Sequence, residues 1–373
     1  MSRILTLAGA VALPAALLAG LTATARADIQ LGLGTATTGS VAALGEQTAI
    51  GAKQAVEDIN AKGGVLGQKL VLTVGDDACD PRQAVALANR FVTSGIKAVD
   101  GHLCSGSSIP ASDVYHDEGV VMVNPTATNP KLTDRGFENV FRICGRDDQQ
   151  GVVSGTWLAE HYKGKNVAVI DDKQAYGKGL ADEVAKTIQS KGGRIAYRDS
   201  VNAGEKDFSA LISKLKENNI DAVYYGGYHP ELGLIVRQAR EKQLGAQFVA
   251  GDGLNNPEFW AITGSSGEGT LYTDSPSIAS SPRARELVET FRKAGHADVG
   301  NFAYYSYAAI QIIADGIAKA GSADGKKISS ALHANSFDTV VGEIQFDKKG
   351  DVLKPAYVFY EWKDGKNVEV AGK

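Results

Sequence analysis

Short apolar runs alternate with segments of helical periodicity along most of the chain. The runs at residues 29–34, 70–74 and 120–123 are rich in Val, Leu and Ile and end in small or polar residues, which is typical of buried β-strands. In the segments 47–60 and 81–92, apolar residues instead recur every three or four positions, as they do on one face of a helix. This alternation predicts a parallel β-sheet flanked by helices, the α/β class of fold.

A second run of the same alternation begins near residue 147. Its expected strands are 167–170, 195–197, 222–225 and 248–250, its expected helices are 176–191, 208–218, 231–243, 283–294 and 302–320, and the tail at 357–362 has the pattern of an edge or crossing strand. A chain of this length is longer than one hydrophobic core usually serves, and it contains two such runs. We therefore expect two lobes. No low-complexity linker separates the runs. The sequence is therefore compatible with a chain that crosses between the lobes more than once.

Residues 1–27 have the pattern of a secretory signal peptide. Arg3 supplies the positive start, residues 5–21 are apolar and small, and Ala25-Arg26-Ala27 is an A-x-A cleavage site. A membrane anchor is the alternative, but the apolar run is short and a cleavage motif follows it. No cysteine follows the run directly, which argues against a lipoprotein. We therefore expect the protein to be exported to the periplasm.

Net charge and missing motifs argue against several classes of function. Removal of residues 1–27 takes away two arginines and no acid, so the formal net charge changes from −4 to −6, which argues against nucleic acid or an anionic membrane as the main partner. The chain has no G-x-x-x-x-G-K-[ST] loop, no G-x-S-x-G elbow and no H-x-x-x-H pair. Asp76, Asp77 and Asp80 resemble a metal cluster in composition, but helix capping and solvated loop charges explain them better. The sequence thus predicts no enzyme, no cofactor and no bound metal.

The stretch 75–113 has the strongest local signal for a binding site. Asp80 is suited to be a helix N-cap with Pro81 at the first helical position. After a brief strand, the small residues 105–108 open another helix, with Pro110 expected in its first turn. A strand end followed by a helix N-terminus presents free backbone N–H groups and the positive end of the helix dipole. This loop can therefore bind an anion such as a carboxylate.

The chain contains three cysteines, and in an oxidising compartment a pair of them is expected to be bridged. Cys79 and Cys104 both follow strands that we expect to be neighbours in a parallel sheet. A bridge between them would close a loop of about 25 residues and contribute roughly 3–4 kcal/mol in the chain-entropy description. Cys144 would then be left over. Because Phe141 and Ile143 lie next to it, we expect a buried, inert thiol.

Polar side chains recur where the expected strands end. Three lie in the first run and three in the second: Ser105, Thr126, Thr128, Tyr176, Tyr228 and Asp252. Taken singly, such residues more often cap a loop or pack in a core. In doubly wound sheets, however, ligands bind beyond the carboxyl ends of the strands, so the joint placement predicts a cleft between two lobes. Hydroxyls and backbone N–H groups suit a carboxylate, whereas Asp252 and carbonyl oxygens suit an ammonium, and together they fit a zwitterion.

Several longer motifs resemble the leucine/isoleucine/valine-binding proteins of bacterial branched-chain amino-acid ABC importers. They are Asp76-Asp77-Ala78-Cys79-Asp80-Pro81, Gly101-His102-Leu103-Cys104-Ser105, Asp117-Glu118-Gly119, Ala203-Gly204-Glu205-Lys206-Asp207-Phe208 and Tyr224-Tyr225-Gly226-Gly227-Tyr228-His229-Pro230-Glu231. The resemblance implies a type I periplasmic binding protein, in which two α/β lobes, each a parallel sheet flanked by helices, are joined by three crossings and enclose a ligand cleft. It implies lobe one at 28–146 plus 276–354, lobe two at 147–275 plus 355–373, and a disulfide between Cys79 and Cys104.

The resemblance also implies a set of ligand contacts. Ser105 and Thr128 would hold the carboxylate of an amino acid through hydroxyl and backbone N–H groups, and the Tyr228 hydroxyl would close on it from the other lobe. The Thr126 carbonyl, the Thr128 hydroxyl and the Asp252 carboxylate would hold the ammonium.

In the closing lobe, Tyr176 would line the cleft, and two positions depart from the family pattern. Asp252 stands where the family usually has a glutamate, so the ammonium contact would need a water molecule or a tighter closure. In the other lobe, Leu44 occupies a slot where the family tends to place an aromatic residue. The absence of an aromatic side chain at this position would reshape the pocket for the ligand side chain. It favours a broader range of ligands, with aliphatic or aromatic side chains.

The resulting expectation is a monomeric periplasmic protein that captures a neutral, branched-chain amino acid between two closing lobes. It would deliver this ligand to the membrane permease subunits of an ABC importer. Two alternatives stay open: a binding module for aromatic or small polar amino acids, and a sensory protein that reports its ligand to a receptor.

Overall fold

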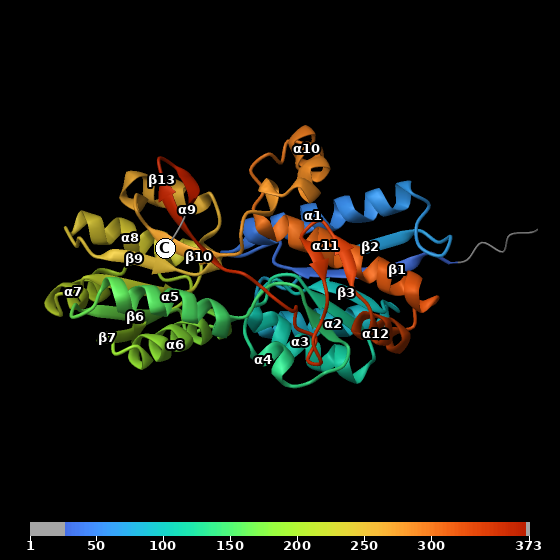
Figure 1. Cartoon of the computed structure of the whole chain (residues 1–373), viewed down its shortest axis with the longest axis horizontal. Helices are drawn as coiled ribbons and strands as arrows, with labels where there is room; N and C mark the ends of the chain where they lie inside the picture. Colours follow the sequence, from blue (N-terminus) through green and yellow to red (C-terminus); the bar gives the residue numbers. More distant parts are fainter. Residues whose placement is uncertain (1–26, 371–373) are drawn as a thin grey trace, which may run out of the picture.

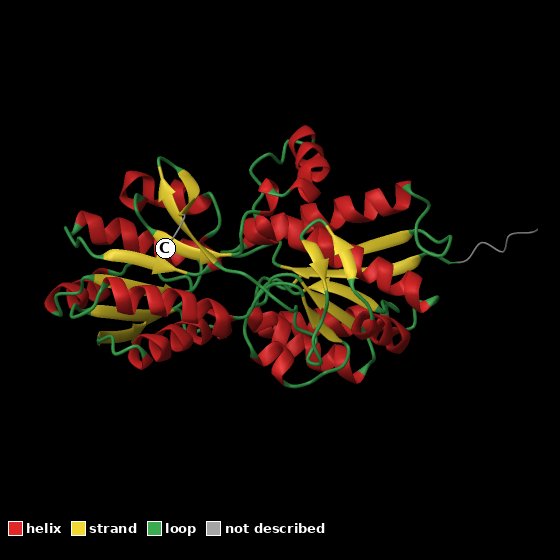
Figure 2. Ribbon diagram, in the orientation of Figure 1, coloured by secondary structure: helices red, strands yellow, loops and turns green. Residues whose placement is uncertain are grey.

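Two β-sheets, each flanked by helices, lie side by side and give the molecule two lobes (Figure 1 and Figure 2). The computed structural model describes residues 27–370, so all of the expected signal peptide except Ala27 lies outside the described residues. Within that range, no helix combines the length and the apolar character needed to cross a membrane.

The first lobe is built on a five-stranded parallel sheet with the strand order β2-β1-β3-β4-β5. Its strands are β1 (Ile29–Thr35), β2 (Leu70–Asp76), β3 (Ala98–Gly101), β4 (Val121–Asn124) and β5 (Val140–Arg142). The helices of this part are α1 (Ala42–Ala61), α2 (Pro81–Thr93), α3 (Ser105–Asp117), α4 (Lys131–Asp134), η3 (Ile278–Ser280), η4 (Pro282–Ala284), α10 (Arg285–Lys293), α11 (Asn301–Ala320) and α12 (Gly325–Ala334). A short antiparallel pair, β11 (Phe337–Thr339) and β12 (Gly342–Ile344), packs against the same core.

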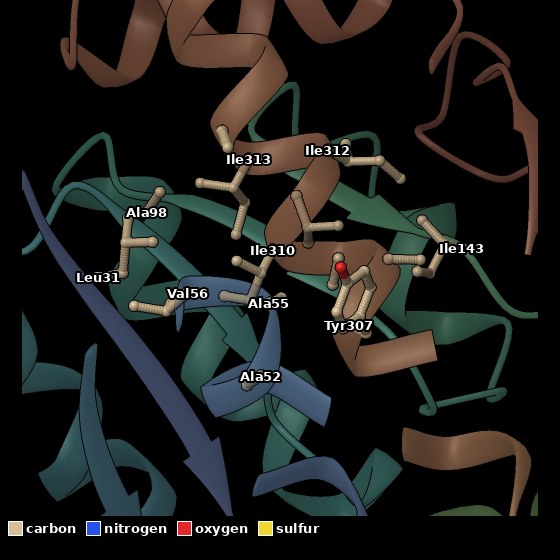
Figure 3. Close-up of a cluster of buried hydrophobic side chains, with 14 of the residues drawn as sticks. Leu31, Ala52, Ala55, Val56, Ala98, Ile143, Tyr307, Ile310, Ile312 and Ile313 are labelled. Carbon is tan, nitrogen blue, oxygen red and sulfur yellow. The ribbon is translucent and has the colours of Figure 1, made fainter. Parts of the chain in front are cut away.

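Helices α1 and α11 pack together over one face of this sheet, although they lie more than 200 residues apart in the sequence (Figure 3). Ala52 and Val56 of α1 and Ile310 of α11 join Leu31 of β1 in one buried cluster. Burial of a Leu, Ile or Val side chain contributes roughly 1.5–3 kcal/mol. This core therefore attaches the C-terminal helices firmly to the N-terminal sheet.

The second lobe is built on a seven-stranded sheet with the order β14-β13-β10-β9-β8-β6-β7. Its strands are β6 (Val167–Asp171), β7 (Ile195–Ser200), β8 (Ala222–Gly226), β9 (Gln247–Ala250), β10 (Leu271–Asp274), β13 (Val358–Lys363) and β14 (Lys366–Val370). Its helices are α5 (Asp147–His161), α6 (Ala175–Ser190), α7 (Ser209–Glu217), α8 (His229–Glu241), η1 (Asp252–Leu254), α9 (Glu258–Thr263) and η2 (Gly264–Gly267). Strands β6 to β10 run parallel, whereas β13 and β14 join antiparallel.

The chain passes between the two sheets three times. The first passage joins β5 to α5, the second joins β10 to η3, and the third joins β12 to β13. The expected α/β fold with two lobes is confirmed, because each lobe contains a mainly parallel sheet with flanking helices. The residue boundaries expected for the lobes stay a prediction.

Two expectations about the first lobe are wrong. Strands β2 and β3 are not neighbours, because β1 lies between them and pairs with both. Helix α1 begins at Ala42 and not at residue 47. Its first turn is closed by the backbone N–H of Gly45, which donates to the Val41 carbonyl over 3.2 Å. A side chain at Gly45 would collide with the Ala36 carbonyl, since a Cβ atom there would lie 1.7 Å from its oxygen; a glycine here thus permits a close approach inside the helix.

One further local expectation is wrong. Pro110 lies in the second turn of α3, because this helix begins at Ser105; the proline therefore removes the helical hydrogen bond to the Gly106 carbonyl. The tail strand β13 follows a crossing between the lobes, which is one of the two roles expected for it, whereas the edge of the sheet is formed by another strand. Strand β14 pairs along the outer side of β13 and forms that edge.

Candidate ligand-binding site

Three of the six predicted site residues lie together at the carboxyl ends of β3 and β4. Ser105 is the first residue of α3, and Thr126 and Thr128 lie on the loop after β4. The Thr126 hydroxyl donates to the Leu103 carbonyl over 2.7 Å, and the Ser105 hydroxyl accepts from the Asn129 backbone N–H over 3.2 Å. These bonds fix the two loops against each other, so the three residues form one polar surface.

Asn124, which sequence reasoning missed, is the central link between these loops. Its Nδ2 donates to the His102 carbonyl and to the Ser108 hydroxyl, both over 2.9 Å. Its Oδ1 accepts from the backbone N–H groups of Thr126 and Ala127, over 3.0 and 2.6 Å. Asn124 is also fully buried, and an asparagine directly after an apolar run was the available signal for this role.

Arg142 is a second missed residue, and it holds the carbonyl side of the same loop. Its guanidinium donates to the carbonyls of Ala127 and Asn129, over 3.1 and 2.8 Å, and forms a buried ion pair with Asp351 at 2.5 Å. A charged residue between Phe141 and Ile143 was a detectable anomaly. Its partner was not detectable, because Asp351 lies 209 residues further along the chain.

The hydrogen bonds leave particular atoms available at this surface. The Thr126 side chain is used in the fold, which leaves its backbone carbonyl as the group that could face a ligand. The Thr128 hydroxyl is buried and lies beside the Asp147 carboxyl group, whose pKa is lowered by the hydrogen bond from Thr128 against the larger effect of burial. The Ser105 hydroxyl accepts one bond and retains a proton to donate.

The other three predicted residues lie together in the second lobe. Tyr176 lies in the first turn of α6, Tyr228 precedes α8, and Asp252 begins η1 after β9. The Tyr176 hydroxyl donates to Asp252 Oδ1 over 2.8 Å and accepts from the Gly253 backbone N–H over 3.0 Å. The rings of Tyr176 and Tyr228 pack with their centroids 5.0 Å apart. Tyr176 therefore orients the Asp252 carboxylate.

The two groups of residues meet where the lobes contact each other. Asn129 Nδ2 donates to the Ala175 carbonyl at the start of α6 over 2.7 Å, which links the loop after β4 to the second lobe. All six predicted residues are buried. Leu44 is fully buried in the same apolar cluster as Tyr176 and Tyr228. The lobes are thus closed over the predicted site.

A hollow of about 750 Å³ lies at the edge of this contact. Residues of both lobes line it, including Gly106 and Pro110 of α3 and Ala175 and Tyr228 of the second lobe. Of the six predicted site residues, Tyr228 lines this hollow.

Burial dominates the electrostatics of the site. It raises the pKa of Asp252, while the hydrogen bond from the Tyr176 hydroxyl works in the opposite direction. Burial likewise raises the pKa values of the Tyr176 and Tyr228 hydroxyls, which keeps both protonated as hydrogen-bond donors. A carboxylate in such surroundings is stabilised strongly by a cation that arrives with its own hydrogen-bond donors.

The expected disulfide between Cys79 and Cys104 is confirmed, with Cα atoms 5.5 Å apart. It forms although β2 and β3 are separated, because both loops reach over the end of β1. Cys104 is also the N-cap residue of α3, so the bridge fixes the helix start that carries Ser105. Cys144 is a buried free thiol, and burial raises its pKa, which agrees with the inert role expected for it.

The interpretation of the acidic motif as caps and solvated loop charges is confirmed for Asp80 as a helix cap but is wrong for Asp77, which is fully buried with its Oδ2 atom 2.5 Å from His102 Nδ1. The Asp80 carboxylate accepts from the backbone N–H groups of Arg82 and Gln83, both over 2.9 Å. Asp76 accepts from the Thr37 and Ala78 backbone N–H groups, both over 2.9 Å. These carboxylates therefore stabilise loop and helix ends.

Two α/β lobes that close over a buried set of hydroxyl, carbonyl and carboxylate groups define a two-lobed solute-binding protein. The chain belongs to the periplasmic binding protein family, whose family model matches residues 28–367. This family is one of substrate-binding proteins and not of enzymes.

Named relatives and solved structures agree with this assignment. The chain is 46% identical over 343 residues to the leucine-, isoleucine-, valine-, threonine- and alanine-binding protein of Pseudomonas aeruginosa, and the match covers 92% of each chain. The leucine binding protein LivK of Thermotoga maritima has a TM-score of 0.85 at 30% identity, covering 92% of this chain and 98% of that one. The substrate-binding protein LivJ of Streptococcus pneumoniae, solved in complex with isoleucine, has a TM-score of 0.83 at 26% identity, covering 92% and 100%. The expected family resemblance is therefore confirmed.

Proposed function

We propose that this protein captures a neutral, branched-chain amino acid between its lobes and delivers it to the permease subunits of an ABC importer. The observation that carries the proposal is the buried Asp252 carboxylate, which lies in a region of the lobe contact that also buries the hydroxyl groups of Ser105 and Thr128. An acid that can pair with an ammonium, together with hydroxyl donors for a carboxylate, matches the two ends of an amino-acid zwitterion.

The contacts we assign follow from the atoms that the fold leaves available. The hydroxyl groups of Ser105 and Thr128 and nearby backbone N–H groups hold the ligand carboxylate, and the Tyr228 hydroxyl closes on it. The Thr126 carbonyl and the Asp252 carboxylate hold the ammonium, and the Tyr176 hydroxyl orients Asp252 through their 2.8 Å hydrogen bond.

The relatives support the ligand class. The Pseudomonas aeruginosa protein is named for binding leucine, isoleucine, valine, threonine and alanine, and the Streptococcus pneumoniae protein was solved with isoleucine. In this chain, the fully buried Leu44 contributes an aliphatic wall. We therefore favour ligands with aliphatic side chains, including amino acids whose side chains are smaller than that of leucine.

Lobe closure is the mechanism we propose for capture. A ligand shifts an open–closed equilibrium only through contacts that differ between the two states. Ser105 and Thr128 lie on one lobe, whereas Tyr228 and Asp252 lie on the other. An amino acid between them touches both walls only when the lobes are closed, so binding and closure stabilise each other.

The remaining parts of the proposal concern location and organisation. Residues 1–27 act as a cleaved signal peptide and deliver a monomeric protein to the periplasm. The lobes comprise 28–146 plus 276–354 and 147–275 plus 355–373. The protein binds its ligand without converting it, since the proposed contacts supply hydrogen bonds and charge but no nucleophile–base pair.

A thermal-shift screen of the mature protein, refolded to remove bound ligand, tests this proposal against the common amino acids. A ligand at about 100 times its dissociation constant adds roughly 2.7 kcal/mol of stability, which raises the melting temperature visibly. We expect leucine, isoleucine and valine to give the largest shifts. If aromatic or small polar amino acids lead, the ligand class is wrong; if no amino acid shifts the melt, the zwitterion site is wrong.

A sensory role is the second candidate, and no particular contact in the structure favours it. Growth of a deletion strain on the leading ligand as sole nitrogen source separates the two roles. Transport predicts slow growth that the intact gene restores, whereas a sensor predicts normal uptake.

A further inference from the structure

The imidazole ring of His102 lies outside the proposed ligand contacts, yet it is bound on both sides. Its side chain is fully buried, as is that of Asp77, and its Nδ1 atom lies 2.5 Å from Asp77 Oδ2. On the other side of the ring, the Nε2 atom lies 2.9 Å from the Tyr115 hydroxyl of α3. A buried ring with a partner at each nitrogen is held in one orientation.

The partners of the ring assign its protons. An ionised carboxylate only accepts hydrogen bonds, so the Nδ1–H group of His102 donates to Asp77. Burial raises the pKa of the Tyr115 hydroxyl, and the charge of Asp77 raises it further. This hydroxyl therefore keeps its proton and donates to Nε2, which satisfies both ring nitrogens within the first lobe.

The ring joins the same two loops that the disulfide joins. Asp77 belongs to the loop after β2, and His102 belongs to the loop after β3. The disulfide lies two residues further along in both loops, at Cys79 and Cys104. Asp77 Oδ1 also accepts from the Cys79 backbone N–H over 2.8 Å. The loops are thus held together twice, once by a covalent bond and once by the carboxylate–imidazole pair.

This pair reaches across the end of β1, which separates β2 from β3. Gly34 lies at that end, and a Cβ atom there would lie 2.7 Å from Nδ1 and Cε1 of His102. The absence of a side chain at this position therefore makes room for the ring. The Asp77 backbone N–H donates to the Thr35 carbonyl over 2.9 Å, which fixes the acid to the same strand end.

The loop that the ring holds carries part of the proposed ligand site. The His102 carbonyl accepts from Asn124 Nδ2 and from the Ser108 hydroxyl, both over 2.9 Å. Ser105 follows shortly after His102 and begins α3. A shift of His102 would therefore move the Ser105 hydroxyl, which we assign to the ligand carboxylate.

We propose that His102 is a positioning residue of the ligand site, which together with Asp77 forms a second clamp, parallel to the disulfide, on the loop that carries Ser105. This inference rests on the function proposed above for the identity of the ligand. Because both clamps restrict the same movement, either one holds the loop when the other is lost. Loss of both frees the loop, so its effect on binding exceeds the product of the two separate effects.

A general contribution to stability is the alternative role for this pair. It would lower the melting temperature of the protein but leave the leucine affinity of the folded protein unchanged. Such a contribution would also be independent of the disulfide, so that the two losses would not reinforce each other in binding.

The experiment measures leucine binding by calorimetry in four proteins. They are the unmodified protein, His102→Phe, the bridge-free variant with Cys79→Ser and Cys104→Ser, and the combination of these changes. Phenylalanine keeps a ring beside Gly34 but offers no donor to Asp77. We expect each single loss to weaken leucine binding less than about fivefold, and the combined loss to weaken it roughly 100-fold or more.

Three further variants make the comparison specific. His102→Asn in the bridge-free protein retains a donor for Asp77, and it should bind leucine within about fivefold of the bridge-free protein. Tyr115→Phe removes only the hydroxyl at Nε2 and replaces His102→Phe in the comparison if that variant does not fold without the bridge. Tyr304→Phe removes a hydroxyl from a buried ring of α11 that packs on Phe291, and it should leave leucine binding unchanged with or without the bridge.

Two outcomes would overturn the inference. One is a combined effect no larger than the product of the single effects. The other is an unchanged leucine constant in every variant, with only the melting temperature lowered. Melting curves of the ligand-free proteins establish which variants are folded at the temperature of the titrations.

Hydrogen exchange of the ligand-free proteins separates this inference from the proposed function. The backbone N–H groups of Ser107 and Ser108 donate to the Cys104 carbonyl over 3.1 and 2.8 Å and close the first turn of α3. We expect them to exchange markedly faster only when both clamps are lost. If the unmodified protein binds no amino acid in the thermal-shift screen, the proposed function fails, and equal exchange in all four proteins would then refute the clamp by itself.

Discussion

At the scale of single residues, Asp252 carries the largest expected contribution to binding. Its carboxylate is buried and oriented by Tyr176 over 2.8 Å. Asp252→Ala would leave the ligand ammonium buried without this charge, and loss of one partner from a buried ion pair typically costs about 3–5 kcal/mol. We expect calorimetry to show leucine affinity reduced by at least two orders of magnitude, with the melting temperature of the ligand-free protein nearly unchanged.

A control for this variant is Glu241→Ala, which removes an exposed carboxylate from α8. It should bind leucine like the unmodified protein. Near-normal affinity of Asp252→Ala would remove the role assigned to this residue, whatever the ligand.

Asp172 gives a prediction about pH, because burial raises its pKa to about 7, compared with an ordinary value near 3.8. The Gln174 backbone N–H opposes this shift and the nearby Glu231 adds to it. The folded state thus holds a proton that the unfolded state has already released. The stability that this proton provides is complete below pH 3.8 and is lost as the pH rises to about 7.

Asp172→Asn should remove this pH dependence, since asparagine stays neutral and can still accept from the Gln174 N–H. The difference in unfolding free energy between variant and unmodified protein should therefore grow in favour of the variant between pH 4 and pH 7, by at most roughly 4 kcal/mol. Denaturant titrations of the ligand-free proteins at several pH values measure it. A difference that is constant across this range would contradict the assigned pKa.

At the scale of elements, local pattern was sufficient for most strands and helices but not for their arrangement. Apolar runs and helical periodicity are properties of neighbouring residues, so β6, β8 and α11 lie close to their expected ranges. The order of strands depends on pairing between distant segments, which is why β1 could lie unexpectedly between β2 and β3. The early start of α1 depends on a close contact between Gly45 and Ala36, which no pattern of apolar positions records.

For the candidate site too, local sequence features predicted some residues, whereas contacts between distant segments could not be predicted. The rule that ligands bind at strand ends selected six residues, and the structure buries all six where the lobes meet. The rule missed Asn124, which links the two loops of the first lobe through its side-chain hydrogen bonds. It also missed the pair of Arg142 and Asp351, because a sequence separation of 209 residues leaves no local trace of which acid meets which base.

At the scale of the whole molecule, the closed arrangement depends on contacts that cross between the lobes. Asn129 makes one of them: its Nδ2 donates to the Ala175 carbonyl over 2.7 Å, while its Oδ1 accepts from the Lys131 backbone N–H over 2.9 Å. The first bond exists only when the lobes are together. The second lies within one lobe and supports the start of α4.

Asn129→Ser separates these two roles, since a serine hydroxyl can still accept from the Lys131 N–H but is too short to reach Ala175. Loss of one hydrogen bond in the closed state costs about 1 kcal/mol, so we expect leucine affinity to fall roughly fivefold, mainly through faster dissociation. Small-angle scattering should show the same compact shape for both ligand-saturated proteins and a larger average size for the ligand-free variant. If affinity falls while the ligand-free size stays equal, Asn129 acts on the ligand loop and not on closure; an unchanged affinity would show that this bond makes no net contribution to the closed state.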